Sequence, residues 1–330
     1  MTYSSGGLIQ ATDYNGFVST TAGANVNDIW AAGSTDKGYG ESAVSTVSAF
    51  GVVSATQWAT LVNNISSMAS HQGTGITSRS APTAGNTINI LSNLNTDLTN
   101  LTTNRGNAAG SGTQYTSWTG TSAKTSGTGS GSSAWTITFT HTVTFASANA
   151  ARYFWNAGGI VKWQVGKSST GTVADPEWND LAGTLAGSIF ITGRVNGAAQ
   201  TINGTSYTGV TKSGGTGSPT VLATTLGWYN LTTSDQSLYQ QYADTSPYTS
   251  QYILLNARTA GSGTQLVLTT TWVDPGGGAA GAPDNISGGS DSSGVSFGSA
   301  PATLVSYIPP SATYLTTAAW GTPTVAATVS

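Results

Sequence analysis

The chain has 330 residues, of which 38% are hydrophobic and only 7% are charged, whereas an ordinary soluble domain has roughly 25% charged residues. Its formal net charge is −3 and its ten Lys and Arg residues form no cluster, which argues against nucleic-acid binding through phosphate neutralisation. The absence of cysteine excludes disulfides and thiolate sites, while ten Trp and thirteen Tyr supply the apolar area of a folded core.

The length of the chain suggests two domains, at roughly 100 to 200 residues per domain. Met1–Gly7 contains neither the basic nor the apolar region of a secretory signal peptide. No run of about 18 apolar residues occurs, so we expect neither a signal peptide nor a membrane-spanning helix.

The first hundred residues have the patterns of helices. Thr12 or Asp13 can cap a short helix that extends to about Ala24, with Tyr14, Phe17 and Val18 on one face. A second helix is predicted from the capping box Ser54-Ala55-Thr56-Gln57 to about Gln72, before Gly73. Its apolar residues recur at three- and four-residue spacing, at Trp58, Leu61, Val62, Ile65, Met68 and Ala69.

A third helix is predicted from about Thr87 to Asn104. Leucines recur in it with alternating spacings of three and four residues, at Leu91, Leu94, Leu98 and Leu101. This heptad pattern can form a short oligomer seam between copies of the chain, or it can pack inside its own domain. We favour the second interpretation because the pattern is only two heptads long.

The remainder of the chain has β patterns. Residues 107–131 are rich in Gly, Ser and Thr and are predicted to be a linker or loop between a helical domain, 1–106, and a β domain, 132–330. The strand Trp135–Phe145 alternates apolar residues with threonines. Further strands are expected at Ala151–Trp155, Ile160–Gly166, Gly187–Val195, Thr220–Asn230, Tyr252–Thr259, Gln265–Val273 and Gly294–Phe297. The predicted fold class is therefore α+β, with a helical N-terminal part followed by a mainly antiparallel β-sandwich.

Two local motifs interrupt this pattern. Residues 152–163 combine an aromatic run, a turn-forming tetrad and an alternating strand, which predicts a β-hairpin. The segment that starts at Asp175-Pro176-Glu177 predicts a short helix, since it has a cap, a proline suited to the first turn and an early carboxylate.

Candidate catalytic residues are few. His141 lies on the apolar face of its strand, where a buried histidine is expected more often than a catalytic one, and His71 is suited to a helix C-terminus. Asp175, Glu177 and Asp180 form an acid cluster, which we interpret as helix capping rather than glycoside hydrolysis. We therefore predict no catalytic residue, no cofactor and no metal site.

Three aspartates are candidate ligands for a calcium ion. Asp274, Asp284 and Asp291 lie in a glycine-rich stretch and carry oxygen ligands, but they lack the dense acid spacing of a calcium loop.

Tyrosines give the strongest binding signal. Five lie close together in the sequence, with glutamines between them, at Tyr229, Tyr239, Tyr242, Tyr248 and Tyr252. They can stack on sugars, form a subunit interface, or fill the core of the sheet.

Several segments resemble, in their residues and in their order along the chain, virion structural proteins of tailed bacteriophages, especially marine and cyanobacterial phages. The segments are Ala11–Asn15, Gly38–Gly40, Ser54–Trp58, His71–Gly73, Ala151–Gly159, Gly227–Thr233 with Asp235-Gln236, Trp272–Asp274 and Tyr314–Thr317. The resemblance implies a tail-fibre-like structural protein without a catalytic motif, assembled in the host cytoplasm and exposed on the extracellular particle.

We expect a non-enzymatic component of the tail, baseplate or fibre. Its expected partners are other virion structural proteins and identical copies of itself in a homo-oligomer, for example a trimer. Contact with a host-surface glycan is a further expectation, whereas nucleic-acid binding and membrane insertion are not expected. The alternatives are a capsid decoration protein and a carbohydrate-binding adhesin or depolymerase.

Overall fold

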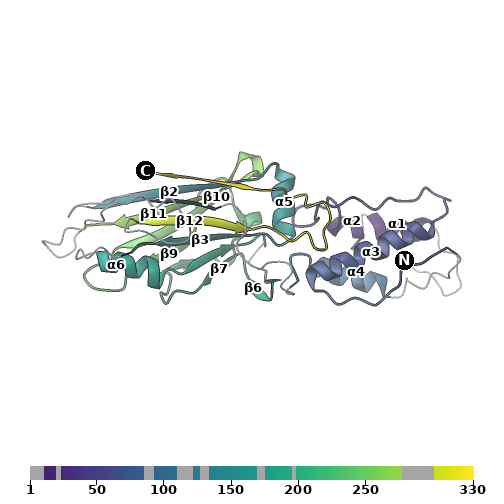
Figure 1. Cartoon of the computed structure of the whole chain (residues 1–330), viewed down its shortest axis with the longest axis horizontal. Helices are drawn as coiled ribbons and strands as arrows, with labels where there is room; N and C mark the ends of the chain where they lie inside the picture. Colours follow the sequence, from purple (N-terminus) through teal and green to yellow (C-terminus); the bar gives the residue numbers. More distant parts are fainter. Residues whose placement is uncertain are drawn as a thin grey trace.

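The computed structural model describes residues 11–19, 24–84, 93–109, 122–126, 134–168, 175–194, 198–276 and 301–330. The molecule is elongated, with helices at one end and β-sheets at the other (Figure 1). The predicted α+β class, with a helical part before antiparallel sheets, is confirmed. In these ranges, no helix combines the length and the apolar character that crossing a membrane requires.

The helical part consists of α1 (Ala11–Ser19), α2 (Val26–Ile29), α3 (Ala55–Gln72) and α4 (Leu94–Thr103). The capping box of α3 is confirmed, since the Ser54 hydroxyl accepts from the Gln57 amide at 3.3 Å and the Ser54 amide donates to Gln57 Oε1 at 2.8 Å. Gly73 ends α3 in the left-handed region, with φ 64°. Tyr14, Phe17 and Val18 on α1 are buried as predicted.

The sandwich consists of a six-stranded and a five-stranded antiparallel sheet. The first has the order β13 (Thr324–Val329), β2 (Trp135–Thr144), β11 (Gln265–Asp274), β10 (Tyr252–Ala260), β9 (Gln236–Tyr242) and β8 (Val221–Leu222). The second has the order β1 (Ser122–Ser126), β12 (Ala302–Ile308), β3 (Ile160–Gly166), β4 (Ser188–Ile191) and β7 (Val210–Ser213). A separate hairpin is formed by β5 (Gln200–Ile202) and β6 (Thr205–Tyr207).

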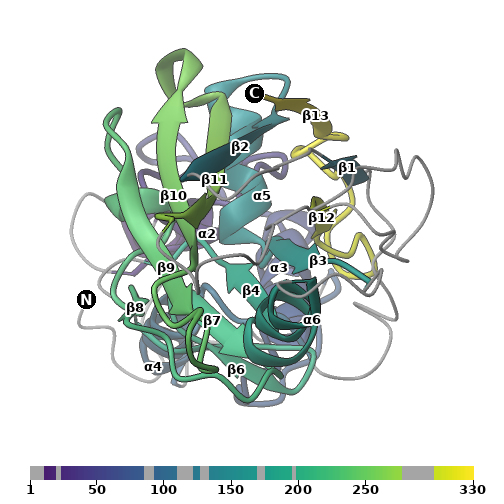
Figure 2. The ribbon, with the colours of Figure 1, turned by 90° about the vertical axis from the view of Figure 1, so that its left-hand side faces the viewer.

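The core of the sandwich lies between these two sheets, which face each other when viewed along the long axis (Figure 2). On β2 the alternating residues Ile137, Phe139, His141 and Val143 are buried, as the period-two pattern predicts. Trp163 on β3 donates its indole N–H to the Thr270 hydroxyl on β11 at 2.8 Å, which joins the two sheets through the core. A single cluster of buried apolar residues continues from here into the helical part.

The predicted hairpin at residues 152–163 is wrong in its first half. Residues 148–156 form helix α5 (Ala148–Asn156), and only Ile160–Gly166 is a strand. The Ser147 hydroxyl caps α5 by accepting from the Ala150 amide at 3.0 Å, and alanines fill its first turn. The expected strand Ala151–Trp155 is therefore helical, and α5 lies where the sandwich meets the helical part (Figure 1).

Other strand predictions are confirmed in part. Of the expected strand Thr220–Asn230, only Val221–Leu222 is extended, and Trp228–Asn230 forms a 3-10 turn. Gly294–Phe297 lies outside the described residues. Strands β5, β6, β7, β9, β12 and β13 lie outside the segments for which the sequence predicts strands.

The helix predicted at Asp175 is confirmed as α6 (Asp175–Asp180), which continues as a π-helical turn over Leu181–Leu185. Within the predicted linker 107–131, residues 122–126 form strand β1, which pairs with β12. The exact domain boundaries remain a prediction.

Candidate functional site

The predicted leucine seam is an internal one. Leu94, Leu98 and Leu101 on α4 are fully buried in the core of this chain, and Leu91 lies outside the described residues. These three side chains have no surface to offer a second copy. The oligomer interpretation is therefore wrong for them, and packing within the chain holds a helix that is rich in Asn and Thr.

The five predicted tyrosines separate into buried and accessible ones. Tyr239 is fully buried and donates its hydroxyl to the Ala186 carbonyl at 3.0 Å, while Tyr248 is 8% exposed. Both belong to the core, so the binding interpretation is wrong for them. Burial raises the pKa of the Tyr239 hydroxyl above its usual value.

Tyr242 and Tyr252 remain partly accessible on the outer face of the six-stranded sheet. They are direct cross-strand partners on β9 and β10, and their ring centroids are 5.0 Å apart. Gln240 on the same face donates to the Tyr242 hydroxyl at 3.3 Å. Half-buried Leu254 lies opposite Gln240, so these four side chains form a local uncharged patch.

Tyr229 belongs to a different site, the junction between the helical part and the sandwich. Its hydroxyl donates to Asn156 Oδ1 on α5 at 2.5 Å. Asn156, which is 4% exposed, donates in turn to the carbonyls of Lys37 and Gly38 at 2.7 and 2.9 Å. Burial raises the pKa of the Tyr229 hydroxyl, which keeps it a neutral donor.

His71 occupies the other side of this junction. Its ring is fully buried, lies edge-on to the Tyr39 ring at a centroid distance of 5.0 Å, and donates from Nε2 to the Ala157 carbonyl at 3.1 Å. Burial lowers the pKa of the His71 imidazole to about 4, because the charged form loses its hydration. Gln72 donates to the Tyr39 hydroxyl at 2.8 Å, so neighbouring residues at the end of α3 hold both rings.

Charged side chains complete the junction around its rim. Arg152 on α5 donates to the Thr35 carbonyl at 3.2 Å and the Ala32 carbonyl at 2.5 Å. Glu41, which is 5% exposed, accepts from the Thr316 hydroxyl at 2.7 Å and the Thr317 amide at 3.0 Å. The residues 30–41, α5 and the segment before β13 are thereby joined by side-chain hydrogen bonds.

Glycine is required at one point of this contact. Gly40 has φ 84°, and a Cβ atom there would lie 2.6 Å from the Tyr153 ring and from the Ala319 methyl group. The Gly38-Tyr39-Gly40 segment was noted in the sequence, but its contact with α5 joins residues more than a hundred positions apart. No local pattern reveals such a contact.

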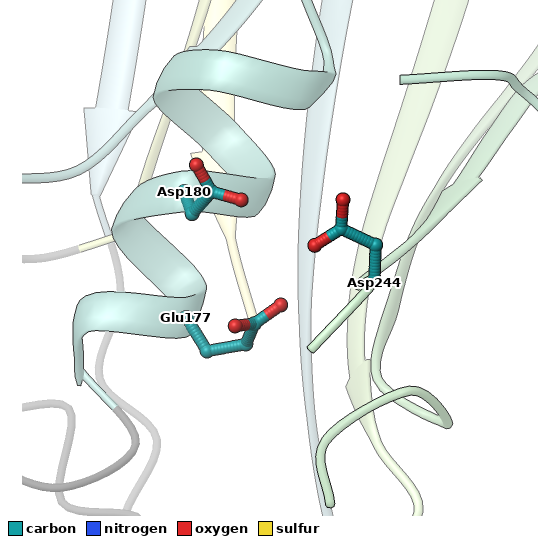
Figure 3. A group of neighbouring side chains, drawn as sticks. All are labelled: Glu177, Asp180 and Asp244. Atoms are coloured by element: carbon teal, nitrogen blue, oxygen red, sulfur yellow. The ribbon is translucent and has the colours of Figure 1, made fainter. Parts of the chain in front are cut away.

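The acid cluster gains a member that the sequence analysis missed. Glu177 and Asp180 on α6 face Asp244, which follows β9, and one carboxylate oxygen from each lies within 4.8 Å of the others (Figure 3). The Thr245 amide donates to Glu177 Oε1 at 3.3 Å. Oxygen ligands of this kind could hold a hard cation such as calcium.

The other candidate catalytic and metal-binding residues of the sequence do not form a site among the described residues. His141 is fully buried on β2. Asp274 is 3% exposed and accepts from Gln251 Nε2 at 3.1 Å and from the Gly276 amide at 2.8 Å, while Asp284 and Asp291 lie outside the described residues. Asp274 therefore has structural partners, and no grouping with the other two aspartates can be described.

Comparison of the chain with known protein families, with curated proteins and with solved structures found no match in any of the three.

Proposed function

We propose that the chain is a non-enzymatic structural component of a tailed-phage virion, located in the tail, baseplate or fibre. The observation that carries the proposal is the junction, because segments that resemble virion proteins meet there. Tyr39 contacts His71, and His71 contacts Ala157. Asn156 contacts both Gly38 and Tyr229.

These residues belong to four of the resembling segments, which are separate in the sequence and form one packed unit in space. The segments are Gly38–Gly40, His71–Gly73, Ala151–Gly159 and Gly227–Thr233. Two further resembling segments, Ala11–Asn15 and Ser54–Trp58, meet near the beginning of α3, where the Tyr14 and Trp58 rings are 5.1 Å apart. If the similarity of these short segments to virion proteins were due to chance, there would be no reason for the segments to contact one another in the fold. Their convergence supports a resemblance in the construction of the protein, and not only in its composition.

The elongated shape supports a role in assembly. Helices lie at one end and the sandwich at the other (Figure 1), so one end can attach while the other is exposed. With only 7% charged residues, the chain is suited to contacts made through apolar and hydroxyl groups. The proposed partners are other virion proteins and identical copies of the chain.

Two measurements on purified phage particles test this proposal. Mass spectrometry should detect the chain in particles that have been separated from host lysate, and its absence would contradict a virion role. Cryo-electron microscopy should then place the elongated density at the tail, baseplate or fibre. Density on the capsid surface would replace this location with that of a decoration protein.

Carbohydrate binding is a second candidate function, favoured by the Tyr242–Tyr252 pair. Aromatic rings beside an amide on an exposed sheet face can stack on a neutral sugar and donate hydrogen bonds to it. Glycan-array binding should be lost in both Tyr242→Ala and Tyr252→Ala and kept in Tyr207→Ala, which alters a partly exposed tyrosine on β6. Unchanged binding in the first two variants would remove the pair from any recognition role.

A further inference from the structure

Arg194 makes neither a hydrogen bond nor an ion pair with the described residues. It follows β4 in the sandwich and is half-buried. Its Nε is shielded from solvent and has no hydrogen-bond partner, and no carboxylate in the described part of the chain lies within ion-pair distance of its guanidinium. Because buried polar groups are nearly always hydrogen-bonded, an arginine with five unused N–H donors needs a physical explanation.

The Arg194 guanidinium lies against the backbone of Gly106, in the segment that follows α4 of the helical part. A Cβ atom at Gly106 would lie 2.8 Å from Arg194 Cδ and 2.9 Å from Nη1. Gln200 Nε2 donates to the Gly106 carbonyl at 2.9 Å, which holds this backbone beside the sandwich. The close approach of the two parts at this point therefore requires glycine.

The backbone of Arg194 is packed as well. A Cβ atom at Gly227 would collide with the Arg194 carbonyl oxygen. A Cβ atom at Gly193, the preceding residue, would lie 2.7 Å from the Trp155 Cβ. The side chain of Arg194 therefore leaves a fixed backbone at the junction, unlike that of an arginine on a free surface loop.

A second arginine brings positive charge to the same place. Arg105, which directly precedes Gly106, pairs with the Asp36 carboxylate and donates from Nη1 to the Thr102 carbonyl at 2.8 Å. Burial and the charge of Arg105 lower the pKa of the Arg194 guanidinium, and the Asp36 charge offsets this effect only in part. Two arginines and one aspartate leave a net positive charge at this point.

We propose that Arg194, with Arg105 beside it, forms a binding site for a small oxyanion of the phosphate or sulfate class. Among the three nitrogens of the guanidinium, only Nε is buried without a partner, so the two terminal nitrogens reach solvent. A guanidinium binds two oxygens of such an anion through parallel hydrogen bonds. Arg194 supplies these bonds and Arg105 contributes its charge. The inference does not depend on the virion role.

The charge of the site favours an anion over water. A water molecule satisfies the hydrogen bonds of Arg194 but leaves its charge beside that of Arg105. Attraction between opposite charges is stronger where protein partly excludes the solvent, so a half-buried cation gains more from an anion than an exposed one does. Oxyanions are favoured over chloride because their oxygen spacing matches the fork of the guanidinium.

A bound oxyanion would connect the two parts of the molecule. Arg105 follows α4 of the helical part and Arg194 follows β4 of the sandwich, so the anion attracts one cation from each part. A ligand that binds only the folded chain raises its stability. The melting temperature should therefore rise with the concentration of the anion.

Arg194→Met is the variant that removes the site. Methionine keeps an unbranched chain against Gly106 and removes the charge. Because the guanidinium makes no bond to the described residues, melts in sodium chloride should show that Arg194→Met folds and is at least as stable as the parent chain. Arg258→Met is the matched control, since Arg258 on β10 pairs with Asp235 at 3.3 Å and lies in the sandwich.

Isothermal titration calorimetry with sodium phosphate, at an ionic strength held constant with sodium chloride, gives the readout. The parent chain and Arg258→Met should bind phosphate at a single saturable site. Arg194→Met should bind it at least about tenfold more weakly, because hydrogen bonds to a charged group are lost. Arg194→Lys keeps the charge without the planar fork, so its affinity should lie between those of the parent and Arg194→Met.

Thermal melts in the same buffers give an independent readout. Phosphate stabilises many proteins without binding to a site, and this general effect should be equal in all variants. The additional rise in melting temperature should therefore occur in the parent and in Arg258→Met, but not in Arg194→Met.

Two results would overturn the proposal. One is a parent chain that shows no saturable binding of phosphate or of sulfate. The other is binding that Arg194→Met retains unchanged, which would place the anion elsewhere on the chain.

Discussion

His71 makes the stability of the chain depend on pH. Its pKa is about 4 in the folded protein, against an ordinary value of 6.5. Between these values the unfolded chain binds a proton that the folded chain does not, so stability falls as the pH falls from 6.5 towards 4. The loss is ~3 kcal/mol when complete. Below about pH 4 His71 causes no further loss of unfolding free energy, and above about pH 6.5 it causes no loss.

Urea unfolding at pH 7.0 and pH 4.5 measures this contribution. We expect the parent chain to lose ~2 to 3 kcal/mol more than His71→Gln between the two pH values, since glutamine does not titrate. Carboxylates titrate in both proteins and cancel in the comparison. Equal losses in the two proteins would show that His71 is not the group responsible.

The Asn156 side chain uses both its amide group and its carbonyl oxygen in hydrogen bonds at the junction. Replacing it with alanine removes the partner of two backbone carbonyls and of the Tyr229 hydroxyl. Because buried polar groups without partners are costly, Asn156→Ala should lower the unfolding free energy by about 3 kcal/mol. Asn63→Ala, an exposed position on α3, should change it by less than about 0.5 kcal/mol. Chemical denaturation distinguishes the two, and similar small effects would contradict the role of Asn156.

At the scale of single elements, the end of α3 offers a comparison of two glycines. Gly73 has φ 64°, and a Cβ atom there would come no closer than 3.8 Å to Ala109, so Gly73→Ala meets no clash. Its cost is conformational, about 1 kcal/mol. Gly75→Ala should be neutral or slightly stabilising, since its φ is not in the left-handed region and the space is open. Thermal unfolding of both variants checks the difference, and equal melting temperatures would contradict it.

Elements with strong local signals were predictable from the sequence. Helix α3 has a capping box, an apolar stripe and a terminal glycine, and β2 alternates without interruption. Helix α5 was missed because its aromatic residues favour strands, while its true signals, a serine cap and alanines, are weaker. Phe154 and Trp155 are buried in the core and Tyr153 is partly buried against it, so tertiary packing overrode β propensity.

The candidate site was less predictable, for physical reasons. Tyr239 and Tyr242 lie three residues apart on one strand, yet one is core and the other surface, because strand residues alternate between faces. Which face is outward depends on the second sheet, which the spacing of tyrosines does not reveal. Asp244 joins Glu177 only because β9 ends beside α6.

At the scale of the whole molecule, the helical part and the sandwich should unfold together. One cluster of buried apolar residues includes Phe17 and Leu98 from the helical part and Phe139 and Trp272 from the sandwich. We therefore expect a single calorimetric transition whose calorimetric and van't Hoff enthalpies agree. Two resolved transitions would mean that the junction does not couple the parts.

The bond between Glu41 and Thr316 has a consequence for how the chain matures. Its two residues are 275 positions apart, so at roughly 5 to 20 residues per second a ribosome needs about 14 to 55 s to make the second after the first. Until then the Glu41 carboxylate lacks the hydroxyl that it accepts from in the finished protein. The helical part can form its local turns during translation, but its attachment to the sandwich becomes complete only after the last strands have emerged.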